Sequence, residues 1–270
     1  MINKKGIKNL ILEDIESPII LYEDKTDIDN VVCEFTNEYR YFSEEAKQFI
    51  DKVFEEKKKT NSKLYNGLIY GLTNFEVYGR KIFLSFEKGD YKTYLATGDN
   101  GYKKYIIENN FFILPIGVCG VITTKDNKLI FSGKTKFCDY VKFLSGFVSI
   151  EDITQEEQID ILHTINRECK EEIGDLQLFN NSIIGAIKTN CCTFVTNHDT
   201  NYTSDEIKEI YKNNISEDKY EMENMFFVDN DEKSIEKMII NSDLNEVGKI
   251  ALRFYLKEKF SNYKFMHMRL

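Results

Sequence analysis

The sequence predicts an α/β protein, with an α/β/α sandwich over residues 110–270 and a small α+β unit over residues 1–109. Three observations support this prediction. Short β-type runs flank one amphipathic helical segment, another helical segment closes the chain, and the hydrophobic periodicity changes near Asn109 and Asn110. A chain of 270 residues with 42% hydrophobic residues can build one large domain or two small ones.

The predicted amino-terminal unit consists of a helix followed by short strands. Ser43 can cap the helix, and an apolar stripe at helical spacing continues it through Phe49, Ile50, Val53 and Phe54. Residues 64–97 change to β-type runs, for example at residues 81–86. Turn-forming residues separate these runs at positions 66–67, 78–79 and 88–89.

The predicted sandwich begins with a hairpin. A strong strand pattern runs from Leu114 to Thr123, and turn residues 125–128 return the chain into the apolar run at 129–131. Further β-type runs follow at residues 183–187, 191–196 and 225–228. A helical pattern over residues 244–260 closes the chain.

The composition argues against several classes of protein. A formal net charge of −9, spread through the chain, disfavours a generic binder of nucleic acid or of anionic membranes. The first residues form neither a signal peptide nor a membrane span, so we expect a cytoplasmic protein with no membrane partner. The cysteines show no CxxC pair and the histidines no ligand spacing, which favours reduced structural thiols over a zinc site.

The most informative segment is a predicted helix rich in carboxylates. Residues 154–157 form a capping-box pattern, and Gly174 is placed to end the helix. Glu168, Glu171 and Glu172 fall on one helix face, beside an apolar stripe. Like charges at this spacing repel each other, and a hard divalent cation bound by oxygen ligands would compensate them. A solvated acidic face is the alternative interpretation.

The segment Arg-Glu-Cys-Lys-Glu-Glu-Ile-Gly, residues 167–174, resembles the REUXEEXGU half of the Nudix box. Cys169 takes the apolar position, whereas Asp175 departs from the last apolar position. The resemblance covers the chain from Leu114 to the carboxyl end, and the order of hairpin, glycine, helix and strand agrees with it. The sequence is therefore identified as similar to the Nudix hydrolase superfamily, which implies the α/β/α sandwich of that family.

The same resemblance implies a reaction and a set of site residues. Glu168, Glu171 and Glu172 correspond to the metal-binding glutamates of the box, and Arg167 corresponds to the arginine that orients them. The implied enzyme is a Mg²⁺-dependent pyrophosphohydrolase, with Mn²⁺ as a substitute, in which water attacks a phosphorus of a nucleoside diphosphate derivative. An ordinary surface salt bridge is the alternative for Arg167.

The first half of the motif departs from the family pattern. A glutamate is expected six residues after the glycine and eight before the arginine, but counting from Gly146 and Arg167 reaches Asp152 and Ile159, so seven extra residues separate the halves. Because seven residues are close to two helical turns, we expect the extra residues to extend the helix from its capping box. The candidates to replace the missing carboxylate are Asp152, Glu156 and Glu157.

The amino-terminal unit gives the best indication of the substrate. Residues 90–97 and the strand pattern at 114–118 resemble the UDP-sugar-cleaving branch of Nudix hydrolases, which implies a nucleotide sugar. We expect this unit to shape substrate choice or a homodimer interface. After the box, Glu221 is the first candidate for an additional metal-binding or base carboxylate and Glu223 the second, with plain surface acidity as the alternative for both.

Three functions remain open at this point. The first is hydrolysis of a nucleotide-derived small molecule such as a nucleotide sugar, ADP-ribose or a dinucleotide. The second is removal of an RNA cap, against which the acidic net charge and the lack of a clear basic and aromatic strip argue. The third is a non-catalytic Nudix-fold binding protein, which the altered first half of the motif favours.

Overall fold

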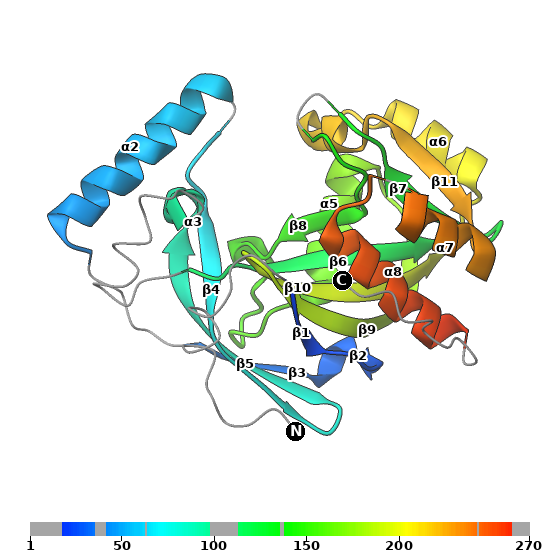
Figure 1. Cartoon of the computed structure of the whole chain (residues 1–270), viewed down its shortest axis with the longest axis horizontal. Helices are drawn as coiled ribbons and strands as arrows, with labels where there is room; N and C mark the ends of the chain where they lie inside the picture. Colours follow the sequence, from blue (N-terminus) through cyan, green and yellow to red (C-terminus); the bar gives the residue numbers. More distant parts are fainter. Residues whose placement is uncertain are drawn as a thin grey trace.

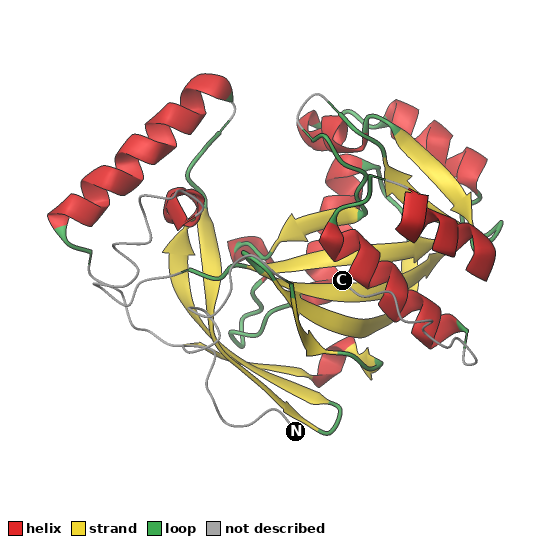
Figure 2. Ribbon diagram, in the orientation of Figure 1, coloured by secondary structure: helices red, strands yellow, loops and turns green. Residues whose placement is uncertain are grey.

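The computed structural model describes residues 18–35, 42–62, 64–97, 113–135, 138–241 and 243–260. They form two sheets with helices packed around them (Figures 1 and 2), so the predicted α/β class is confirmed. The strands of the larger sheet are β1 (Ile19–Tyr22), β2 (Thr26–Asp27), β6 (Ile116–Thr123), β7 (Lys128–Ser132), β8 (Leu144–Phe147), β9 (Leu178–Lys188), β10 (Cys192–Thr200) and β11 (Met225–Asp229). Their order is β1-β9-β10-β6-β7-β11, with β2 paired to β9 and β8 paired to β6.

The smaller sheet has the order β3-β5-β4, and its strands are β3 (Val31–Phe35), β4 (Leu68–Tyr78) and β5 (Lys81–Asp90). The turn predicted at residues 78–79 is confirmed, and Gly79 adopts a left-handed φ of 61° there. The turn predicted at residues 88–89 is wrong. Lys88 and Gly89 lie inside β5, where their pairing with Tyr70 and Ile69 of β4 overrides the local turn signal.

Two helices accompany the smaller sheet. The predicted helix is confirmed as α2 (Glu44–Thr60), and the Ser43 side chain accepts a hydrogen bond from the Ala46 amide at its start. The second helix, α3 (Tyr91–Thr97), replaces a predicted β-type run. Asp90 Oδ1 accepts a hydrogen bond from the Thr93 amide at 3.0 Å, which stabilises the first helical turn.

The amino-terminal segment contributes to both sheets. β1 and β2 pair antiparallel with β9 of the larger sheet, whereas β3 lies parallel to β5 in the smaller one. The two sheets also meet where Gly71 bridges Pro115. The boundary predicted near Asn109 and Asn110 lies outside the described residues, and the division into two domains stays a prediction.

Helices cover both faces of the larger sheet, as an α/β/α sandwich requires (Figure 1). These helices are α5 (Ile161–Glu172), α6 (Ser204–Asn213), α7 (Glu232–Asn241) and α8 (Glu246–Lys259), of which α6 and α7 were not predicted. On one face Ile165 of α5 shares a core with Val118, and on the other Tyr255 of α8 shares a core with Cys119. Neighbouring side chains of β6 thus point to opposite faces. Within the described ranges, no helix combines the length and apolar character needed to cross a membrane.

Helix α5 begins later than predicted. Its N-cap is Asp160, whose side chain accepts a backbone hydrogen bond from the first turn, so the capping box predicted at residues 154–157 is wrong. The extra residues form a turn between the bridged residues Ile153 and Ile159, in which Glu157 adopts a left-handed φ of 58°. The end of the helix is as predicted, because Glu172 is its last residue and a glycine follows shortly after.

This turn contacts the smaller sheet. Gln158 Oε1 accepts a hydrogen bond from the Cys33 amide at 2.8 Å, and Gln158 Nε2 donates to the Cys33 carbonyl at 3.0 Å. The side-chain amide thereby pairs with the backbone of the edge strand β3 as a neighbouring strand would. The extra residues therefore connect the two sheets instead of lengthening α5.

Candidate functional site

The carboxylates of α5 face β8, where a glycine leaves room for one of them. A Cβ atom added at Gly146 would lie 1.9 Å from both Cδ and Oε1 of Glu168. Any side chain at this position would therefore displace the Glu168 carboxylate. The glycine of the first half of the motif is required by packing against the second half.

Arg167 forms ion pairs with three carboxylates of the site. Its Nη2 atom lies 3.0 Å from Asp152 Oδ2 and 2.9 Å from Glu168 Oε1, and its Nη1 atom lies 3.1 Å from Glu171 Oε2. Nη2 also donates a hydrogen bond to the Phe147 carbonyl at 3.0 Å. A planar guanidinium with several fixed donors suits this role, because each bond restricts the orientation of the others.

Of the three candidates for the missing carboxylate, Asp152 is the one that joins this cluster. Its side chain is buried, accepts hydrogen bonds from the Ser149 amide and from Arg167, and lies 2.8 Å from His163 Nδ1. Burial alone would raise the pKa of Asp152, but the hydrogen bonds from Arg167 and Ser149 lower it below its usual value. Glu156 and Glu157 lie exposed on the turn before α5, so they do not replace it.

A second group of charges lies around the end of α5. Glu172 is 1% exposed, its Oε1 atom lies 3.9 Å from Lys142 Nζ, and its Oε2 atom has no hydrogen-bond partner. Lys142 Nζ lies 2.7 Å from Glu221 Oε2, on the 3₁₀ helix η4 (Glu217–Met222). The structure thus brings Glu221 to the carboxylates of α5. The second candidate, Glu223, is exposed, and its charge instead helps to raise the pKa of Tyr211.

Burial makes the carboxylates at the centre of the site reluctant to ionise. It raises the pKa of Glu168 to about 8, with Arg167 opposing this shift and neighbouring carboxylates adding to it. Burial also raises the pKa of Glu172 well above its usual value, with Lys142 opposing and Glu221 and Glu168 adding. Such perturbed groups, gathered in one place, are typical of functional sites.

Aromatic side chains from the amino-terminal part of the chain border the site. The ring of Phe147 on β8 lies 5.2 Å from that of Tyr94 and 6.4 Å from that of Tyr91, both on α3. Burial raises the pKa of Tyr91, and the charge of Glu221 adds to this effect, so the two side chains are electrostatic neighbours. The spacing of Tyr91 and Tyr94 within residues 90–97 contained the signal, because residues three apart share a helix face. It indicated no partner ring.

Sequence reasoning missed Lys142 entirely. The residue belongs to no motif, and its position depends on an isolated pairing with Ser132 at the end of β7. The Lys142 amide donates to the Ser132 carbonyl at 3.0 Å, and the Ser132 amide donates back at 2.9 Å. Burial alone would lower the pKa of Lys142, but Glu172 and Glu221 raise it above its usual value, so the side chain carries a positive charge.

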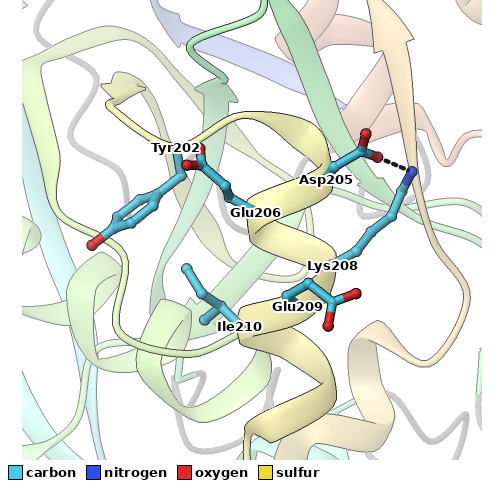
Figure 3. A pocket seen from close by; sticks show the side chains of 6 residues that line it. All are labelled: Tyr202, Asp205, Glu206, Lys208, Glu209 and Ile210. Atoms are coloured by element: carbon cyan, nitrogen blue, oxygen red, sulfur yellow. Dashed lines mark hydrogen bonds and ion pairs between the residues drawn. The ribbon is translucent and has the colours of Figure 1, made fainter.

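A surface hollow beside α6 is lined by residues that do not belong to this cluster (Figure 3). Its acidic groups already have partners, since Asp205 pairs with Lys208 at 2.8 Å and Glu206 accepts hydrogen bonds from Thr203. These contacts stabilise the start of α6. We assign this hollow no chemical role.

Comparisons with known proteins add similarities of chain trace. A Nudix-family hydrolase from Clostridium perfringens shares 20% identity over 52% of this chain and 97% of its own, with a TM-score of 0.32. A pyrophosphohydrolase from Bacillus subtilis shares 15% identity over 54% of this chain and 84% of its own, with a TM-score of 0.36. A bifunctional NMN adenylyltransferase/ADP ribose pyrophosphatase from Francisella tularensis, in complex with AMP and a Mn ion, shares 12% identity over 62% of this chain and 49% of its own. Its TM-score is 0.34.

No protein-family model matches the sequence, and no curated protein matches it either. Identities and TM-scores as low as those above assign no function. The function has to be inferred from the site itself.

Proposed function

We propose that the chain is a Nudix-type hydrolase that uses a divalent cation to cleave the diphosphate linkage of a nucleoside diphosphate derivative. The observation that carries this proposal is the buried carboxylate cluster, in which Glu168 and Glu172 resist ionisation and no donor group hydrogen-bonds to Glu172 Oε2. Buried polar atoms without a partner are rare, and buried charges are normally paired or bound to metal. A divalent cation would supply the positive charge that the cluster lacks.

The donor set fits a hard cation such as Mg²⁺, with Mn²⁺ as a substitute, because its members offer carboxylate oxygens. Glu168, Glu171 and Glu172 remain the proposed ligands, as the resemblance implies. In the part of the chain that the structure describes, no three His, Cys, Asp or Glu side chains already surround a metal position. Arg167 and Lys142 hold the carboxylates instead. When bound, the metal would lower the pKa of a water molecule and neutralise charge on the diphosphate.

The protein side chains have separate roles in this proposal. Arg167 orients Glu168 and Glu171 through its guanidinium, and Asp152 fixes Arg167 from the buried side. Glu221 is the proposed general base, because its side chain is 38% exposed and so can reach a water molecule beside the buried carboxylates. Acceptance of a proton by Glu221 would produce the attacking hydroxide at the edge of the cluster.

The substrate is proposed to place its nucleoside part against the aromatic rings that border the site. Tyr91, Tyr94 and Phe147 offer π faces and apolar edges next to the carboxylates. Two of these residues come from the amino-terminal part, which supports the prediction that this part shapes substrate choice. UDP-sugars are the proposed first substrates to test. A cytoplasmic location and a homodimer stay predictions.

The proposal is tested by incubating the protein with Mg²⁺ and a panel of UDP-sugars, ADP-ribose, dinucleoside polyphosphates and capped RNA, in ¹⁸O-labelled water. We expect two phosphate-containing products from one class, with ¹⁸O in one of them and no turnover in excess chelator. Turnover of capped RNA alone would identify a decapping enzyme instead. Full turnover in chelator would contradict a metal-dependent mechanism.

One observation favours a second candidate, a non-catalytic binding protein. Lys142 already compensates part of the charge on Glu172 and Glu221, so the cluster is partly neutralised by the protein itself. Such a protein would bind a nucleotide without hydrolysing it. Binding of a panel member in a calorimeter, together with no product after prolonged incubation with metal, would favour this candidate.

A further inference from the structure

The ammonium group of Lys142 lies inside the carboxylate cluster. It approaches Glu221 Oε2 to 2.7 Å and Glu172 Oε1 to 3.9 Å, and only 13% of the side chain is exposed. The charged end of a lysine normally reaches water, so a lysine buried this deeply needs a compensating partner. Here the partners are Glu221, the proposed base, and Glu172, a proposed ligand of the divalent cation.

Backbone hydrogen bonds fix the position of Lys142. Ser132 pairs with the Lys142 backbone through two hydrogen bonds, at 2.9 and 3.0 Å. The hydroxyl of the same serine donates to the Glu221 carbonyl at 2.9 Å. One residue at the end of β7 therefore anchors both members of the Lys142–Glu221 ion pair. The pair is held by the backbone and not only by attraction between two flexible side chains.

We propose that Lys142, held in the cluster by its ion pair with Glu221, is a resident counter-cation that competes with divalent cations for Glu172. The inference rests on the proposed function, because it takes Glu172 as a metal ligand. An ammonium and a divalent cation use the same carboxylate oxygens, and two cations in one small buried space repel each other. Metal binding therefore requires the ammonium to move away.

The competition has a consequence for the substrate. Lysine carries its charge on a flexible four-carbon stem, so the displaced ammonium stays near the cluster and can pair with a diphosphate oxygen. Lys142 thus compensates the carboxylates before the metal binds and the diphosphate afterwards. Removing its charge is expected to strengthen metal binding and to weaken substrate binding, which are effects of opposite sign.

The test is a calorimetric titration of the full-length protein with Mn²⁺ alone, comparing wild type with Lys142→Met. We expect the variant to bind Mn²⁺ about tenfold more tightly, which corresponds to about 1.4 kcal/mol. In chelator the variant is expected to unfold at a temperature about 2–4 °C lower, because Glu172 and Glu221 lose their counter-cation. If Lys142→Met fails to fold, Lys142→Gln keeps a hydrogen-bond donor without charge and is titrated in its place.

Two further variants control the titration. Lys134 forms an ion pair of the same length, 2.7 Å with Asp243, but both side chains are more than half exposed. Lys134→Met is therefore expected to leave Mn²⁺ affinity unchanged, whereas Lys142→Arg keeps the charge and is expected to resemble wild type. Equal or weaker Mn²⁺ binding by Lys142→Met would overturn the competition while leaving the proposed function intact. No Mn²⁺ binding by any variant would overturn both.

Discussion

Replacing Glu172 by Gln tests whether a carboxyl group that destabilises the fold by its burial is kept for function. The side chain is 1% exposed, its Oε2 atom has no partner, and Lys142 is 3.9 Å away. Gln preserves the size and cannot ionise. Because burial raises the pKa of Glu172, folding at neutral pH requires either a buried charge or the uptake of a proton, and Gln avoids both costs. In chelator the variant is therefore expected to be more stable by about 1–3 kcal/mol.

The same substitution is expected to reduce turnover strongly. Losing one preorganised charge-stabilising group in an active site costs about 10²–10³ in kcat. The assay combines urea unfolding in chelator with steady-state hydrolysis of the best panel substrate in Mg²⁺. The opposite directions of the two effects are the diagnostic result, since a mutation that merely damages the fold would reduce both stability and activity.

Glu171→Gln is the matched control on the same helix. Glu171 is 37% exposed and pairs with Arg167 four residues earlier at 3.1 Å. A partly exposed pair of this kind contributes about 0.3–0.5 kcal/mol, so removing it is expected to change the free energy of unfolding only slightly. A Glu172→Gln variant with wild-type turnover, or with lower stability than wild type in chelator, would refute the reasoning.

Three further predictions follow from single contacts. Gly146→Ala would place a Cβ atom 1.9 Å from the Glu168 carboxyl group and displace it, so turnover is expected to fall about 10²-fold. Wild-type kinetics would show that the position of Glu168 is unimportant. The pKa of His198 is lowered to about 3 because burial disfavours its charged form, while the unfolded chain keeps a value near 6.5. Between these values the unfolded state binds more protons, so this histidine reduces stability by about 1.4 kcal/mol per pH unit as pH falls below 6.5. His198→Gln should remove that component from urea unfolding measured at about pH 7.5 and pH 5, and an unchanged pH dependence would contradict it. Gln158→Ala removes two hydrogen bonds to Cys33 and is expected to lower the free energy of unfolding, measured in urea, by about 1–3 kcal/mol. A smaller loss than for replacement of an exposed control glutamine would argue against this contact.

The sequence was most informative where local patterns determine structure. The apolar stripe predicted beside the glutamates is the buried face of α5, which includes Ile165 and Cys169, and Gly174 predicted the end of the helix. The motif also directed attention to Arg167 and to the glutamates beside it. These features depend on contacts within one helix and between adjacent turns, which a single sequence records directly.

The start of α5 shows where local patterns fail. Residues 154–157 and Asp160 both offer capping side chains, and nothing local distinguishes them. The structure uses Asp160, because the preceding turn contacts β3 through Gln158. Lys142 was missed for a similar reason, since its place depends on pairing with Ser132, ten residues away and in no recognisable motif. Contacts between distant segments decided both outcomes.

The most direct test of the carboxylate site is to locate Mn²⁺ by anomalous diffraction from crystals of the protein grown with the ion. We expect an anomalous peak within about 2.5 Å of carboxylate oxygens of Glu168 and Glu172, with the Lys142 ammonium no longer paired to Glu172. A peak elsewhere on the molecule, or none at a Mn²⁺ concentration that supports turnover, would contradict the assignment of these carboxylates as the metal site.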